Sequence, residues 1–182
     1  MTKNRRLVLK GKRVLLRYPE PNDADEYIDL AKSSIRFHRG LMRMPRTADE
    51  FARFIDRSRR EDTECLLVCR RTDGAIAGQI TLSQIFYGPL CSAYLGYGLG
   101  LGFTGNGFAT EAVKLIVRHA FSTLKLHRLE ANIQPNNLPS IAVARRCGFS
   151  KEGFSPKYLK IGGKWRDHER WALIKENWTA NR

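Results

Sequence analysis

The chain has 182 residues, of which 42% are hydrophobic and 27% charged, a composition that fits one globular domain and excludes a disordered, collagen-like or coiled-coil protein. No apolar run approaches the roughly 18 residues of a membrane span, and the N-terminus lacks the apolar core of a secretory signal, so we expect a single domain over residues 1–182 in the cytoplasm, with no membrane partner. The 32 basic and 18 acidic residues give a net charge of +14. This charge favours an anionic partner, such as nucleic acid or a phosphorylated cofactor, over a polyamine substrate. The alternative is that the charge serves solubility alone.

The first elements predicted are a strand and a helix. Residues 13–17 are typical of a strand that stops before Pro19. A helix is expected next, because Asp23 and Glu26 have the spacing of a capping box and an apolar stripe comes after them.

A second helix is predicted from the same kind of signal. Thr47 and Glu50 repeat the spacing of a capping box, and an apolar face follows that runs towards Arg60. The residues of that face are Phe51, Phe54 and Ile55. Residues 37–46, between the two helices, alternate basic and apolar side chains, and we expect them to form a loop over a site.

The middle of the chain changes to a strand pattern. Residues 65–71 and 75–85 predict an antiparallel hairpin around a tight turn, and residues 92–101 predict a third strand. A glycine-rich bend then leads into a strongly apolar helix over residues 108–124.

The last part of the chain predicts a strand, a helix and a hairpin. The strand covers residues 128–134, the short helix covers 140–149, and the hairpin lies within 150–175 and turns at residues 162–163. Helices do not alternate with every strand in this order. The fold class is therefore an α/β (α+β) mixed sandwich and not a doubly wound parallel sheet.

The cysteines and histidines give no metal-binding pattern. The four cysteines do not form a C-x-x-C pair, and the four histidines are dispersed, so we expect reduced thiols and no metal site. The cysteines are Cys65, Cys69, Cys91 and Cys147.

The glycine-rich bend over residues 102–111 is the first candidate site. Glycines permit a tight turn and leave successive N–H groups uncovered, and at a helix N-terminus such donors favour an anion, most often phosphate. The bend is not a P-loop, because no Gly-Lys-Ser/Thr sequence follows it. A plain strand-to-helix turn remains the alternative.

A second candidate site begins where strand 128–134 ends. Asn137 leaves the strand end and Ser140 stands at the start of the next helix, so both side chains can point into one cleft beside the glycine-rich bend. The alternative is that the two residues only cap that helix.

Together these segments resemble the GNAT superfamily of acyl-CoA-dependent N-acyltransferases. The run T-G-N-G-F-A-T-E-A resembles the superfamily's pyrophosphate loop, with Gly107 and Ala109 in the fixed places, and HRLEANIQPNNLPSIAVARRCGF resembles its later strand–helix motif. The runs Y-L-G-Y-G-L-G, K-E-G-F and G-K-W-R-D-H are similar to the ribosomal-protein alanine N-acetyltransferase group. The resemblance covers residues 10–178.

The resemblance implies a mostly antiparallel central sheet, splayed between two strands and flanked by helices, with acetyl-CoA as cosubstrate and no metal. The pantetheine slot would be lined by main-chain groups of Leu99, Gly100 and Leu101. The pyrophosphate would be held by amides of Gly105, Asn106, Gly107, Phe108, Ala109 and Thr110. Asn137 would bond the pantetheine arm and Ser140 would give a proton to the leaving thiolate, while the amine attacks the acetyl carbonyl directly.

The chain departs from the family pattern at three positions. Thr104 replaces a Gln or Arg, Ala144 replaces the tyrosine acid of many members, and Lys157 lies near where some alanine acetyltransferases carry a carboxylate. The general base is therefore open: Glu130, Asp167 or water alone could serve an α-amine, whose reference pKa is about 7.7–8.0. Glu111 is expected to be a structural partner.

Three functions remain at this point. The first is acetylation of a protein N-terminus, such as that of a ribosomal protein, by a monomer or homodimer whose basic surface contacts the ribosome or RNA. The second is acetylation of a small-molecule amine. The third is a nucleic-acid-binding module without catalysis, which would use Arg5, Arg6, Lys10, Lys12 and Arg13 but lacks any recognised nucleic-acid-binding motif.

Overall fold

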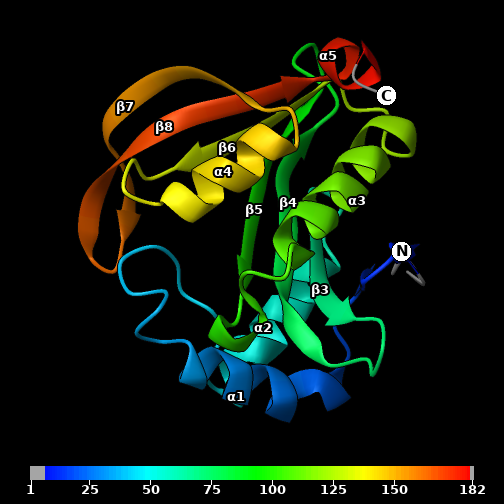
Figure 1. Ribbon diagram of the computed structural model, residues 1–182, viewed down its shortest axis with the longest axis vertical. Helices are drawn as coiled ribbons and strands as arrows, with labels where there is room; N and C mark the ends of the chain where they lie inside the picture. The colour runs from blue at the N-terminus through cyan, green and yellow to red at the C-terminus, as the bar shows by residue number, and fades with distance from the viewer. Residues whose placement is uncertain (1–6, 181–182) are drawn as a thin grey trace.

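A single eight-stranded sheet organises the computed structural model, which describes residues 7–180 (Figure 1). Neighbouring strands are antiparallel, except that β5 and β6 run parallel. In spatial order the strands are β1 Val8–Lys10, β2 Val14–Arg17, β3 Glu64–Arg70, β4 Ile76–Phe86, β5 Ser92–Leu99, β6 Arg128–Ile133, β8 Lys164–Ile174 and β7 Ser150–Ile161.

Two pairs of helices cover the two faces of the sheet. Alternate side chains of β3 separate the two cores: Leu66 and Val68 pack with α3 and α4, whereas Cys65 and Leu67 pack with α1 and α2. The helices are α1 Ala24–Ser33, α2 Ala48–Ser58, α3 Phe108–Ser122, α4 Leu138–Arg146 and the terminal α5 Lys175–Ala180, with 3-10 turns at Pro21–Asp23 and Leu101–Phe103. Among residues 7–180, no helix is long and apolar enough to cross a membrane.

The capping box predicted at the start of α1 is wrong. Asp23 pairs instead with Glu20 around the 3-10 turn that Pro21 begins, one turn earlier in the chain. Glu26 faces the sheet, where its Oε1 accepts a hydrogen bond of 2.6 Å from the N–H of Ile76. The acidic residue assigned to the cap therefore ties α1 to β4.

The cap predicted for α2 is confirmed in part. Thr47 Oγ1 accepts the N–H of Glu50 at 3.2 Å, but Glu50 returns its carboxylate to the N–H of Arg46 at 2.7 Å and not to that of Thr47. The predicted face of Phe51, Phe54 and Ile55 is buried, and the helix ends at Ser58, two residues before the expected end.

The remaining elements follow the predicted order, with two additions. Strand β1 and helix α5 were not predicted; β1 has only three residues, two of them exposed, so it carries little hydrophobic pattern. The closing hairpin turns at Gly162 and Gly163 as expected, both with positive φ. The four cysteines are free thiols, and no cluster of three His, Cys, Asp or Glu side chains that could hold a metal occurs within residues 7–180.

The parallel pair β5–β6 separates partway along its length. Ser92, Ala93 and Tyr94 pair with Arg128, Leu129 and Glu130, and the pairing stops there although both strands continue. The splayed, mostly antiparallel sheet flanked by helices is thus confirmed. The unpaired ends of β5 and β6 leave a gap in the middle of the sheet.

Candidate active site

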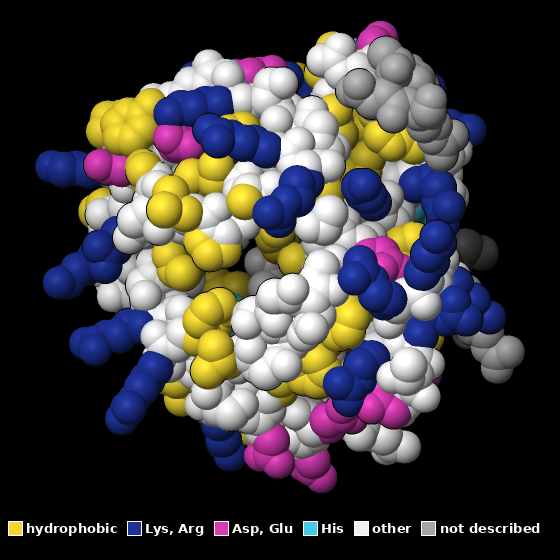
Figure 2. Space-filling view, viewed as in Figure 1, with side chains coloured by type: hydrophobic (Ala, Val, Ile, Leu, Met, Phe, Trp, Pro, Cys, Tyr) yellow, Lys and Arg dark blue, Asp and Glu magenta, His cyan; other side chains and the backbone are white. Residues whose placement is uncertain are grey.

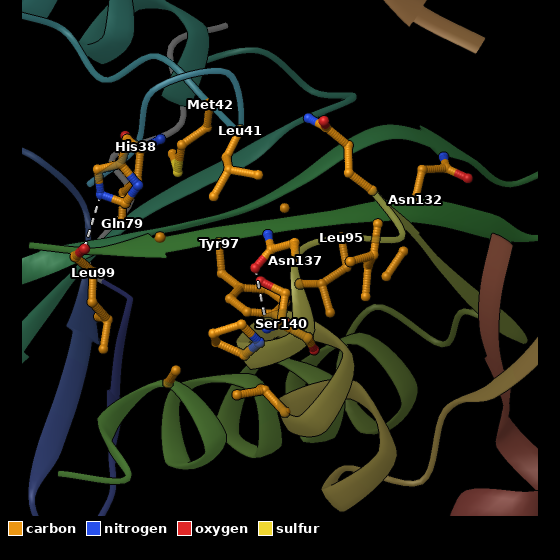
Figure 3. Close-up of a pocket in the computed structure, with 18 of the residues that line it drawn as sticks. His38, Leu41, Met42, Gln79, Leu95, Tyr97, Leu99, Asn132, Asn137 and Ser140 are labelled. Carbon is orange, nitrogen blue, oxygen red and sulfur yellow. Dashed lines mark hydrogen bonds between the residues drawn. The ribbon is translucent and has the colours of Figure 1, made fainter. Parts of the chain in front are cut away.

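A cavity of about 970 Å³ occupies the gap between β5 and β6. Figure 3 shows side chains reaching it from both faces of the sheet: His38, Leu41 and Met42 from one side, Tyr97, Asn137 and Ser140 from the other. In Figure 2 a hollow bordered by hydrophobic side chains opens near the centre of the view. The cavity therefore passes through the sheet.

The glycine-rich bend forms one end of this cavity. Gly105 and Gly107 have φ values of 78° and 72°, a left-handed conformation that side chains other than glycine rarely adopt. A Cβ atom on Gly107 would also lie only 2.9 Å from Nη2 of Arg13. Gly107 is the N-cap of α3, so the uncovered N–H groups of the first helical turn and the helix dipole can bind an anion here.

Glu111 anchors this bend to Arg13, the residue before β2, as the structural role expected for it requires. Its carboxylate accepts the backbone N–H of Arg13 at 2.8 Å and Nε of the same residue at 3.0 Å. Arg13 also donates from Nη1 to the carbonyl oxygen of Asn106 at 2.8 Å. Burial alone would raise the pKa of Glu111, but these hydrogen bonds outweigh it and hold the pKa below its usual value.

Most of the predicted donor-site residues line the cavity. They are Leu99, Gly105, Gly107, Phe108, Ala109, Thr110, Asn137 and Ser140. Gly100, Leu101 and Asn106 lie outside the lining. The N–H of Gly100 already bonds Ala77 O at 2.9 Å and that of Leu101 bonds Ser34 Oγ at 3.0 Å. Of the expected contacts at the end of β5, only Leu99 faces the cavity.

Asn137 and Ser140 have both of the roles that the sequence left open, because they cap α4 and also line the cavity. Asn137 is the N-cap of α4, and its Oδ1 accepts the N–H of Ser140 at 3.3 Å. Both residues also line the cavity, beside the glycine-rich bend. Tyr97, which the sequence did not single out, donates its hydroxyl to the carbonyl oxygen of Ser140 at 2.9 Å, and burial raises the pKa of this tyrosine.

The carboxylates considered as bases lie elsewhere. Glu130 is paired with Nε of Arg128 at 2.8 Å, and Asp167 accepts the N–H of Lys157 at 2.7 Å in the β7–β8 hairpin. Neither lines the cavity, and no other Asp or Glu among residues 7–180 does. Ala144 is buried on α4, so that helix brings no tyrosine to this place.

The first part of the segment 37–46 lies over the cavity, as predicted, whereas Met44 packs into the core beside α1 and α2. His38 Nε2 is 2.9 Å from the carbonyl oxygen of Leu99, and because a carbonyl only accepts, this nitrogen is the donor. Burial lowers the pKa of His38, which keeps the ring neutral near pH 7. Gly98 makes room for this segment, since a Cβ there would collide with Sδ of Met42. On the far side, Gln134 Nε2 donates to Gly40 O at 2.7 Å.

Comparisons with known proteins identify the family of the chain. Residues 13–150 match the profile of the acetyltransferase (GNAT) domain. A probable N-acetyltransferase of Bacillus subtilis, YjcK, is 35% identical over 92% of this chain and 97% of its own length. The Escherichia coli ribosomal protein uS5-alanine N-acetyltransferase is 38% identical over 59% of this chain and 55% of its own length, so this match spans about half of that enzyme. The structure of Mycobacterium smegmatis RimJ in complex with CoA-disulfide superposes with a TM-score of 0.81 at 29% identity, over 93% of this chain and 85% of that one.

Proposed function

The chain belongs to the GNAT family of acetyltransferases, and from that membership we propose that it transfers the acetyl group of acetyl-CoA to the N-terminal α-amine of a protein, such as a ribosomal protein. One domain covering residues 1–182 would carry the whole reaction, in the cytoplasm. The observation that carries the proposal is the cavity through the sheet, which joins the N-terminus of α3 to Ser140 and is lined by side chains from both faces.

The donor half of the cavity suits acetyl-CoA. The uncovered amides from Gly105 to Thr110 would bind the pyrophosphate, because they combine N–H donors with the positive end of the α3 dipole. Leu99 would meet the pantetheine arm through its main chain. Asn137 uses Oδ1 for the helix cap, which leaves its amide N–H₂ to bond that arm.

The chemistry would be a direct attack of the amine on the thioester carbonyl, with no acyl-enzyme. The Ser140 hydroxyl would stabilise and protonate the leaving thiolate, because it lines the cavity while its backbone is fixed by Asn137 and Tyr97. Holding the two reactants together in one cleft can account for much of the rate enhancement. A hydrogen bond to the negative charge that develops on sulfur accounts for a further part.

The acceptor half supports a protein N-terminus over a polyamine. No carboxylate among residues 7–180 lines the cavity, whereas a polycation needs negative charge to offset its own. The β7–β8 hairpin beside the cavity carries the exposed side chains of Lys157, Lys160 and Lys164. Their positive charge would further repel a polyamine. Acetylation of a small, uncharged or anionic amine remains the second candidate.

A basic groove supports a further contact with RNA on the ribosome. A second cavity of about 1000 Å³ lies along α3, and the one carboxylate among its lining residues, Glu111, is already paired with Arg13. Its basic residues are Lys10, Lys12, Arg13, Lys114, Arg118, Arg145 and Arg146. Of the basic residues first considered for nucleic acid, Arg5 and Arg6 lie outside the described residues. This contact would accompany catalysis, not replace it.

The proposal is tested by thiol release from acetyl-CoA. Peptides that begin with Ala, Ser or Met are compared with spermidine and with a panel of neutral and anionic small amines. We expect kcat/KM to be highest for an N-terminal peptide and at least about tenfold lower for spermidine. Equal or better turnover of a small amine would move the assignment to the second candidate, and no turnover of any amine would contradict the proposed reaction.

A further inference from the structure

The acceptor end of the cavity contains one histidine, His168 of β8. This end lies opposite the glycine-rich bend and is walled by Tyr94, Tyr158, Leu159 and His168. No Asp or Glu among residues 7–180 lines it. His38, the other histidine of the cavity, bonds Leu99 at the donor end. An amine that enters from the acceptor end therefore meets His168.

The hydrogen bonding of His168 identifies which ring nitrogen is free. Nδ1 lies 2.9 Å from the carbonyl oxygen of Arg166, and because that oxygen can only accept, Nδ1 carries the hydrogen. In the neutral ring Nε2 is then an acceptor with a lone pair. No hydrogen bond within residues 7–180 occupies Nε2. The fixed tautomer presents a base to the cavity.

The surroundings hold the ring in one orientation. His168 is 2% exposed, and the Tyr158 ring packs edge-on against it with centroids 6.1 Å apart. Tyr158 in turn bonds Tyr94 of β5, which raises the pKa of Tyr94. The charged or titratable side chains on this face of β8, and on the elements packed against it, include Lys164, Arg166, Arg170, Arg128, Glu130, Tyr158, Tyr94 and His38. Arg128 is paired with Glu130 and Glu152.

The strand register places His168 beside the unpaired end of β6, beyond the point where β5 and β6 separate. Asn132 of β6 is opposite Arg170, and Ile133 is opposite Glu169, so the next position along β6, Gln134, faces His168. Side chains diagonal to each other on one face of a sheet lie about 7–8 Å apart, which is the relation of His168 to Asn132. A primary amine held at the unpaired ends of β5 and β6 is within reach of His168.

We infer that His168 is the general base that takes a proton from the acceptor amine, an inference that rests on the proposed function. The ammonium R–NH₃⁺ gives one proton to Nε2 of His168, which later releases it to solvent. The freed lone pair forms the C–N bond, and the C–S bond breaks. The Ser140 hydroxyl gives its proton to the leaving thiolate, which becomes CoA-SH. The second proton leaves nitrogen as the amide forms and restores the Ser140 hydroxyl, so the net release is one proton to solvent.

The inference is tested by comparing His168→Asn with the unchanged enzyme on a peptide that begins with Ala. Asparagine keeps a donor near Nδ1 for the Arg166 carbonyl but has no group in place of Nε2. We expect kcat/KM at pH 6.5 to fall about 10²–10⁴-fold. At pH 9 an α-amine with a reference pKa of about 7.7–8.0 is already neutral, so the deficit shrinks at least about tenfold. Acetyl-CoA affinity, measured by calorimetry, stays within about twofold.

His127→Asn is the matched control, because His127 lies outside the cavity and pairs with Glu176 at 3.1 Å; its kcat/KM is expected to be unchanged. His168→Gln is made in parallel, so that a folding failure of one variant leaves the other. A loss below about threefold, or an equal loss at every pH, overturns the inference and leaves the proposed function standing. If the unchanged enzyme binds acetyl-CoA but acetylates no amine, the proposed function fails, and this inference with it.

Discussion

The hydroxyl of Tyr97 donates to the carbonyl oxygen of Ser140 at 2.9 Å, and this bond joins β5 to the first turn of α4 beside the gap in the sheet. Family members that carry a tyrosine acid would place it at position 144, where this chain has a buried alanine. Tyr97 supplies a tyrosine hydroxyl from β5 instead, but this hydroxyl already donates its hydrogen bond to the backbone carbonyl of Ser140. Under the proposed function, the Ser140 hydroxyl is therefore the donor left for the leaving thiolate.

Ser140→Ala should lower kcat about 10²–10⁴-fold, the usual range for a lost general acid, while acetyl-CoA affinity changes less than about twofold. The hydroxyl acts mainly as charge develops on sulfur, so ground-state binding is spared. Initial rates and calorimetric titration check both numbers. Tyr97→Phe, which keeps the Ser140 hydroxyl, should cost much less in kcat. A loss below about threefold for Ser140→Ala would reduce this residue to a member of the helix cap.

Gly107→Val should weaken acetyl-CoA binding at least about tenfold, because the left-handed backbone and the nearby Arg13 guanidinium leave no room for a side chain. Asn106→Ala keeps every amide of the bend and should stay within about threefold. Gly102→Ala is the second control, since a Cβ there meets nothing within 4 Å and its φ is not positive. Calorimetry that ranks Asn106→Ala below Gly107→Val in affinity would exclude the bend as the pyrophosphate site.

The cavity lining at the glycine-rich bend and at the start of α4 was predictable from the sequence because its determinants are local. Gly105, Gly107 and the helix after them are consecutive in the chain, and Asn137 and Ser140 lie three residues apart at another strand end. Each motif therefore indicates both its backbone shape and its chemistry. The sheet order followed from the same local signals, namely tight turns and apolar runs.

The rest of the cavity lining was not predictable, because its residues meet only through the tertiary fold. His38 contacts Leu99 from 61 positions away, and Tyr97 reaches Ser140 across 43. His168 belongs to a hairpin whose sequence gives no sign that it turns back over the gap. The wrong prediction of a capping box at Glu26 has the same origin. The spacing of Asp23 and Glu26 is typical of a helix cap, but in the folded chain the Glu26 carboxylate accepts a hydrogen bond from Ile76 of β4 instead.

Glu111→Gln should lower the free energy of unfolding by about 1–2 kcal/mol at pH 7, the low part of the range for hydrogen bonds to charged groups, because Arg13 is exposed. The folded-state pKa of Glu111 lies below its unfolded value, so its stabilisation is present above the unfolded pKa and disappears as pH falls through the folded pKa.

The difference between Glu111→Gln and the unchanged protein should therefore shrink in urea titrations run at pH 3. Asp56→Asn is the control, since Asp56 and Arg59 form an exposed pair that should contribute little at either pH. An equally large difference for Glu111→Gln at both pH values would show that the carboxylate charge is not what anchors the bend.

The net charge of +14 is well above the roughly 2–8 units that keep a small domain soluble, and the groove along α3 concentrates part of it. If the groove meets ribosomal RNA, the enzyme should sediment with purified ribosomal subunits at low salt and dissociate as salt rises. Each phosphate that a cation neutralises steepens the plot of log affinity against log salt by about 0.7–0.9. Replacing Lys10, Lys12, Lys114 and Arg118 by Gln should therefore reduce the slope by up to about 3, while kcat on a short free peptide is unchanged.

The matched control replaces Lys32 of α1, Arg53 and Arg57 of α2, and Arg59 just after α2, each by Gln. This control removes the same net charge from another surface. Equal slopes for the two variants would assign the effect to net charge alone, and sedimentation that does not respond to salt would leave the groove without an RNA partner.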